Sequence, residues 1–144
     1  MPMLFGSLLL PAGAEQSEEE LRLLARMECA LAGYPFRAKA RRALGVSGGA
    51  FAVHALDEAD LLPGADGWVI AADARLDNRA ELCADLGIPD AGATTLPDAE
   101  LILRAYQRWG AECPARLLGD FAFAIWDPLE RALFCARDIT GVRP

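Results

Sequence analysis

The feature that most constrains the fold is a pair of apolar runs near the C-terminus, separated by a short polar break. Residues 119–126 read GDFAFAIW, and residues 132–136 read ALFCA. Asp127-Pro128 favours a turn between them, so the two runs are predicted to form an antiparallel hairpin. Successive side chains of the first run point to opposite faces: Phe121, Phe123 and Ile125 to one, and Ala122, Ala124 and Trp126 to the other. A hairpin that is apolar on both faces predicts helices on one side and a second sheet on the other.

The remaining helix and strand signals are segregated along the chain, and they do not alternate. Strands are predicted over residues 3–10, over two segments between Tyr34 and His54, and over residues 68–72, whose sequence WVIAA favours burial on both faces. Helices are predicted over residues 17–32, 77–86 and 98–109, with Ser17 and Asp98 as N-caps and Gly33, Gly87 and Gly110 as stops. This order predicts an α+β fold of layered antiparallel sheets and helices.

Composition excludes several functional classes. The chain has 144 residues, enough for one domain, and its net charge of -7 argues against a nucleic-acid partner. No stretch is long enough to span a membrane, and the apolar start of the chain is interpreted as a buried strand, not a signal peptide. With one histidine and no CxxC pair, no metal site is expected. The cysteines are predicted to be reduced and buried in a cytoplasmic protein: Cys29, Cys83, Cys113 and Cys135.

The C-terminal half resembles a known family. The sequence PDAELILRAYQRWGAECPARLLGDFAFAIWDPLERALFCARDITGVRP is similar to the glutaminase (type 2 glutamine amidotransferase) domain of asparagine synthetases. That family carries patterns like SDTEVIL-AY-WG, RL-G-FAFA-WD and LF-ARD-GVKP, and its NGEIYNYREL segment is similar to ADARLDNRAEL here. The resemblance covers most of residues 67–144. It implies an N-terminal-nucleophile (Ntn) hydrolase fold, an αββα four-layer sandwich of antiparallel sheets covered by helices.

The resemblance also implies a larger parent enzyme. In the family, the GVKP motif leads to the end of this domain and then to an ATP-using synthetase domain. We therefore expect residues 1–144 to be a single glutaminase-like domain, either a C-terminally truncated fragment or a module separated from its partner. No cofactor is expected in this chain, and ATP and Mg would belong to the synthetase domain.

Each position that the family uses for glutamine hydrolysis can be compared with the residue found in this sequence. In the family, an N-terminal cysteine attacks the amide, an Asn-Gly pair holds the oxyanion, and an arginine and an aspartate bind the substrate. Here Pro2 occupies the nucleophile position, Asp73-Ala74 replaces Asn-Gly, and Asp98 remains in register. A carboxylate repels a developing oxyanion, so Asp73, Ala74 and Asp98 are interpreted as a vestigial substrate site without catalytic residues. The family's arginine motif is not found, although three arginines lie in that region: Arg37, Arg41 and Arg42.

These observations predict a catalytically silent domain that acts as a scaffold for the synthetase domain of an ATP-dependent amide-forming enzyme. Relatives without the cysteine include β-lactam synthetases and lasso-peptide cyclases, and the RLDNR phrase at Arg75–Arg79 resembles the cyclases. The expected partners are the synthetase domain, a peptide substrate and a second copy of the chain. Arg137 and Asp138 are predicted to form an internal ion pair that fixes the final loop. Two alternatives stay open: an active glutaminase half whose start is misassigned, and a free-standing amino-acid-binding module around Asp98.

Overall fold

The computed structural model describes residues 3–8, 22, 25, 26, 29, 40–46, 49–55, 61–89, 95–141 and 143. Its larger sheet contains β4 (Leu61–Pro63), β5 (Val69–Leu76), β6 (Gly119–Asp127) and β7 (Ala132–Arg137). These four strands pair antiparallel in the order β4-β5-β6-β7, with Ile70 opposite Ile125 and Ile125 opposite Phe134. The predicted hairpin is therefore confirmed as β6 and β7.

A second, three-stranded sheet contains β1 (Met3–Leu8), β2 (Ala40–Val46) and β3 (Gly49–Ala55), in the order β1-β3-β2 and again antiparallel. The strand predicted over residues 3–10 is confirmed through Leu8, and both strands predicted before His54 are confirmed. The second of these ends at Ala55.

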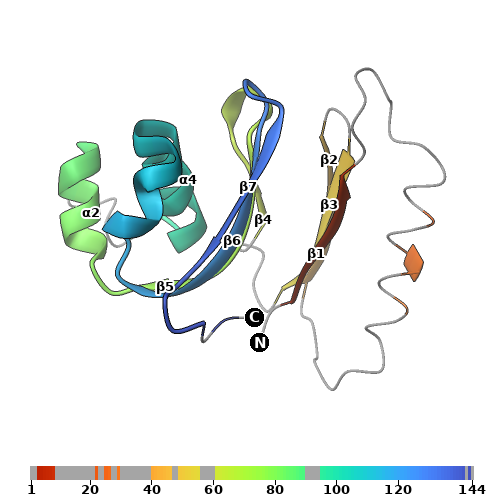
Figure 1. The fold of residues 1–144 in the computed structure, drawn as a ribbon, viewed down its shortest axis with the longest axis horizontal. Coiled ribbons are helices and arrows are strands. Elements are labelled where there is room, and N and C mark those ends of the chain that lie inside the picture. Colours follow the sequence, from red (N-terminus) through yellow and green to blue (C-terminus); the bar gives the residue numbers. More distant parts are fainter. Residues whose placement is uncertain are drawn as a thin grey trace.

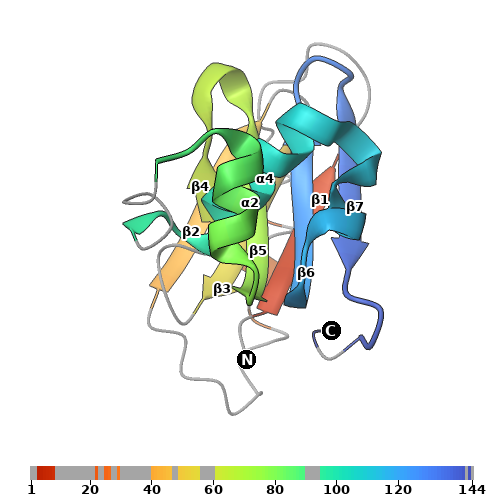
Figure 2. The same ribbon diagram turned by 90° about the vertical axis from the view of Figure 1, so that its left-hand side faces the viewer.

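Two helices cover one face of the larger sheet, and the three-stranded sheet lies on its other face (Figure 1). The helices are α2 (Arg79–Leu86) and α4 (Asp98–Trp109), and both lie in front of the larger sheet when it is viewed from the helix side (Figure 2). Short 3-10 turns, η2 (Ala65–Gly67) and η3 (Gly110–Arg116), complete the described elements. The α+β class is thus confirmed, with helices, one sheet and then a second sheet in the described layers.

The core lies between the helices and the larger sheet. Alternate residues of β5 and β6 point into it, where they meet the apolar stripe of α4. Its fully buried members include Ile70, Leu101, Ile102, Ala105 and Ile125. The stripe predicted for residues 98–109 is confirmed, and so is the end of α2 at Gly87, which adopts a left-handed conformation at φ 70°.

Several predicted details were wrong. The strand predicted to end at residue 72 continues to Leu76, and α2 begins at Arg79 instead of residue 77. Asp98 is not an N-cap: Pro97 takes that position, no side chain caps the helix, and Asp98 lies in the first turn. Neither β4 nor η3 was predicted from the sequence. The helix predicted over residues 17–32 falls almost wholly outside the described residues.

The hairpin and the cysteines also differ from expectation. Residues of β6 are buried on both faces, whereas the β7 face that carries Leu133, Cys135 and Arg137 is exposed. Phe134 and Ala136 pack against the helix-side core, so the exposed face lies on the side of the three-stranded sheet, whose described strands contact β5 and β4. Cys83 and Cys113 are buried as predicted, but Cys29 and Cys135 are exposed. Among the described residues, no helix combines the length and apolar character needed to cross a bilayer.

Candidate functional site

Asp73 lies in the middle of β5 and is buried, with only 5 % of its surface exposed. It shares a strand face with Val69 and Ala71, because the alternate residues Ile70 and Ala72 point into the core beneath the helices. Asp73 therefore faces the three-stranded sheet. Ala74 is on the opposite face and packs against the helix-side core. The two residues that the resemblance aligned with the Asn-Gly pair thus point in opposite directions.

The side chain of Asp73 forms an ion pair with Arg143, at 2.8 Å between Oδ1 and Nη1. The second carboxylate oxygen, Oδ2, and Nε of Arg143 are buried, and neither has a hydrogen-bond partner among the residues that the structure describes. Burial raises the pKa of Asp73, while the charge and hydrogen bond of Arg143 and the charge of the N-terminal amino group act in the other direction. The site therefore presents a buried carboxylate that is paired with a guanidinium.

Asp98 lies in the first turn of α4 and holds together the starts of two helices and the end of a strand. Its Oδ2 accepts a hydrogen bond from the backbone N–H of Leu76 at 3.1 Å, and its Oδ1 is bound by Nη1 of Arg79. Nη2 of the same arginine donates to the carbonyl oxygen of Leu96. Asp98 thus connects β5, α2 and α4.

Asp73 and Asp98 do not share a polar cluster within the described residues. Each has its own arginine partner, Arg143 for the first and Arg79 for the second. Sequence reasoning missed both arginines. The only signals available were the N-R pair in LDNR and the arginine of GVRP, both of which belong to the resemblance. Pro2 and Arg37 lie outside the described residues, and the structure describes only the backbone of Arg41 and Arg42, in β2.

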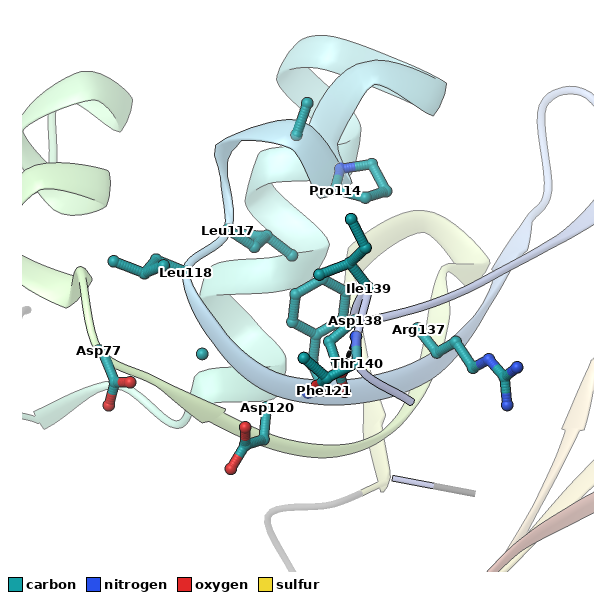
Figure 3. Close-up of a pocket in the computed structure, with 12 residues that line it drawn as sticks. Asp77, Pro114, Leu117, Leu118, Asp120, Phe121, Arg137, Asp138, Ile139 and Thr140 are labelled. Carbon is teal, nitrogen blue, oxygen red and sulfur yellow. Dashed lines mark hydrogen bonds between the residues drawn. The ribbon is translucent and has the colours of Figure 1, made fainter. Parts of the chain in front are cut away.

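Asp138 fixes the loop that follows β7. It is buried, and its Oδ2 accepts from the backbone N–H of Phe121 at 3.1 Å. Its Oδ1 accepts from the backbone N–H of Thr140 at 2.9 Å and from the Thr140 hydroxyl. Arg137 is exposed and extends away from Asp138 (Figure 3). The role of Asp138 in the loop agrees with these bonds, while the Arg137–Asp138 ion pair stays a prediction.

A pocket of about 690 Å³ lies where this loop approaches η3 and the start of β6 (Figure 3). Asp73, Ala74 and Asp98 do not line it. Leu118 and Ile139 are two large aliphatic residues that line it, with 63 % and 103 % of their surfaces exposed. Its other lining residues include Asp77, Leu117, Asp120, Phe121, Arg137 and Asp138.

Arg75 links two acidic residues beside this pocket. Its guanidinium lies 3.3 Å from Asp77 and 3.7 Å from Asp120. The side chains of Arg75 and Asp77 are well exposed and that of Asp120 is partly exposed, so water screens these pairs and they contribute little to stability. Within the described part of the chain, histidine, cysteine and acidic side chains do not gather in groups of three that could bind a metal ion.

The chain is similar to known proteins over its C-terminal half. The model of a family described as "Glutamine amidotransferase domain" matches residues 61–144. A relative from Mycobacterium tuberculosis is 41 % identical over 80 residues, which cover 55 % of this chain and 12 % of the relative. An asparagine synthetase (glutamine-hydrolyzing) of Bacillus subtilis is 35 % identical over 55 % of this chain and 13 % of its own length. That of Gallus gallus is 51 % identical over 35 % of this chain and 9 % of its own length. The chain thus matches only a small part of each relative.

Proposed function

Because this chain belongs to the glutamine amidotransferase domain family of asparagine synthetase-like proteins, we propose that it is a catalytically silent, glutaminase-like domain. In this proposal it serves as a scaffold in an ATP-dependent amide-forming enzyme. The ATP- and Mg-dependent synthetase domain would be its partner, in the same enzyme or as a separate subunit. We also propose a cytoplasmic location and a lasso-cyclase-like parent enzyme that acts on a peptide.

The observation that carries the proposal is the ion pair at Asp73. Glutamine hydrolysis passes through a tetrahedral oxyanion, and removing a single donor from an oxyanion site costs about 2.7 to 4 kcal/mol of transition-state stabilisation. At the position of the family's asparagine, this chain places a buried carboxylate. Its ionised partner, Arg143, is already neutralised by that carboxylate at 2.8 Å. The pair supplies no uncommitted positive charge to the oxyanion.

Two further parts of the proposal rest on the resemblance. Pro2 occupies the nucleophile position and has neither a thiol nor a hydroxyl group, so it provides no nucleophile for an amide. The four-layer αββα arrangement would add a second helical layer beyond the three-stranded sheet. The described layers are compatible with that arrangement, since helices, the larger sheet and the smaller sheet already follow each other in order (Figure 1).

A scaffold role is supported by the exposed side chains of Leu118 and Ile139. Large apolar side chains grouped beside a pocket favour contact with another protein surface. The relatives are far longer than their matched segments, so they contain additional sequence that could supply such a surface. We propose that the synthetase domain covers these two residues.

The test is a glutaminase assay of the purified protein. We expect no release of ammonia from L-glutamine above the blank, measured by coupling to glutamate dehydrogenase, across pH 6 to 9. An active type 2 glutaminase assayed in parallel controls for the coupling system. Ammonia release at a rate proportional to protein concentration would overturn the proposal and would favour the alternative, an active glutaminase half.

A further inference from the structure

The carboxylate of Asp98 is already bound to a cation that belongs to the same chain. Arg79, the first residue of α2, reaches across to the start of α4 and places its guanidinium between two acceptors. Nη1 donates to Oδ1 of Asp98, and Nη2 donates to the carbonyl oxygen of Leu96. Two acceptors that each bind a different terminal nitrogen match the planar, multi-donor shape of a guanidinium group, which a single ammonium group does not share.

The other oxygen of Asp98 is also engaged. Its Oδ2 accepts from the backbone N–H of Leu76, so both carboxylate oxygens have partners within the fold. The side chains of Arg79 and Asp98 are 26 % and 20 % exposed, so the site lies at the surface of the domain. A small solute could therefore reach Asp98 once the arginine side chain is removed.

We infer that Leu96 and Asp98 form a guanidinium-binding site that Arg79 fills from within the chain, and that Arg79 thereby closes Asp98 to free amino acids. This inference deepens the proposed function, on which it rests, because it describes how a vestigial ligand site is blocked. A free ligand must compete with a tethered group whose effective concentration is on the order of millimolar or higher. It must also bring a cation to a carboxylate whose charge is already balanced.

The experiment removes the guanidinium group of Arg79 and supplies a small guanidinium compound in solution. Arg79→Ala deletes the equivalent of ethylguanidinium from the side chain, so ethylguanidine is the matched probe. We expect millimolar ethylguanidine to raise the melting temperature of Arg79→Ala by about 3 to 8 °C and to leave the unsubstituted protein unchanged. Ethylamine, which lacks the planar fork, should have a smaller effect. If Arg79→Ala does not fold, Arg79→Gln takes its place, since an amide retains donors while losing the charge.

A matched control distinguishes the site from a simple surface carboxylate. Within the described part of the chain, Arg104 binds only Glu100 in the same helix, at 2.8 Å and 2.9 Å, and no carbonyl from another segment. Arg104→Ala should therefore gain no stability from ethylguanidine. The double variant Arg79→Ala/Asp98→Asn should also lose the response.

Three results would overturn the inference: no response in Arg79→Ala and Arg79→Gln, an equal response in Arg104→Ala, or a rise in melting temperature of the unsubstituted protein with L-glutamine that Asp98→Ala abolishes. None of these depends on ammonia release. The inference can therefore fail while the proposed silence of the domain stands, and the reverse also holds.

Discussion

Three carboxylates are buried among the described residues, and they differ in what they bind. Asp127 accepts from the backbone N–H groups of Leu129 and Glu130, and Asp138 accepts from those of Phe121 and Thr140. Asp73 instead binds one side chain, Arg143, and leaves its second oxygen unpartnered. Backbone donors fix a turn and a loop in the first two cases. The ion pair of Asp73 fixes neither a turn nor a loop. The free-energy cost of burying this carboxylate must therefore be offset by favourable interactions elsewhere in the fold.

The burial of Asp73 predicts an inverted pH dependence of stability. Its pKa in the folded state is raised above the ordinary value of 3.8, so the folded protein binds the proton more tightly than the unfolded chain does. The stability that this adds is fully present below pH 3.8 and is lost as the pH rises through the folded pKa. The advantage of the unsubstituted protein over Asp73→Asn should therefore shrink as the pH rises from 3.5 to 7.

Urea denaturation of both proteins at half-unit pH intervals measures this difference. Taking the difference cancels titrations that the two proteins share, so the slope reports Asp73 alone. An advantage that grows with pH would contradict the prediction, because it would mean that Arg143 lowers the pKa by more than burial raises it.

Gly119 begins β6 and pairs with Leu76 at the end of β5. Gly119 has φ 139°, and a Cβ atom at this position would lie 2.0 Å from the carbonyl oxygen of Arg75. The strand pair therefore requires glycine for both its backbone conformation and its space. We predict that Gly119→Ala lowers the free energy of unfolding by about 3 to 5 kcal/mol, because the strands must separate or shift.

The control for Gly119→Ala is Gly87→Ala. Gly87 also has a positive φ, of 70°, but a Cβ atom there would meet nothing within 4 Å. Its substitution carries only the cost of a left-handed alanine, about 1 to 2 kcal/mol. Equilibrium urea denaturation compares the two variants. Equal losses would show that conformation alone, and not contact with β5, makes Gly119 necessary.

The elements with regular apolar spacing could be predicted from the sequence. The apolar stripe of α4 and the alternating apolar residues of β6 show which faces of these elements must be buried against another element. The end of β5 could not be predicted in this way. Asp73 and Arg75 look like loop residues, yet they continue the strand because they pair with Ala122 and Asp120. The η3 segment has no apolar period and contains Pro114, so its 3-10 geometry depends on tertiary contacts.

The resemblance named Asp73, Ala74 and Asp98 as site residues, and this assignment stays a prediction. It gave no indication of the side chains that bind the two aspartates. The arginines that bind the two aspartates come from α2 and from residue 143, beyond the end of β7, and only the folded arrangement places them there. A sequence pattern gives a residue's place on a strand or helix. It does not give the distant side chain that will balance a buried charge.

At the scale of the whole molecule, the helix layer and the larger sheet bury most of the described apolar residues. Leu118 and Ile139 depart from this pattern: they lie at the wall of one pocket, away from the core, and are largely exposed. In the proposed parent enzyme a synthetase domain covers them. In the isolated chain of 144 residues the described elements leave them largely exposed.

We therefore predict that the isolated chain self-associates through this surface. The double substitution Leu118→Lys/Ile139→Lys should weaken association at least about tenfold, because it replaces two exposed aliphatic contacts with like charges. Leu129→Lys is the matched control, since Leu129 is 78 % exposed but does not line the pocket. Sedimentation velocity over a concentration series measures the effect. A clean monomer of the unsubstituted chain, or equal weakening by Leu129→Lys, would show that Leu118 and Ile139 do not form an adhesive surface.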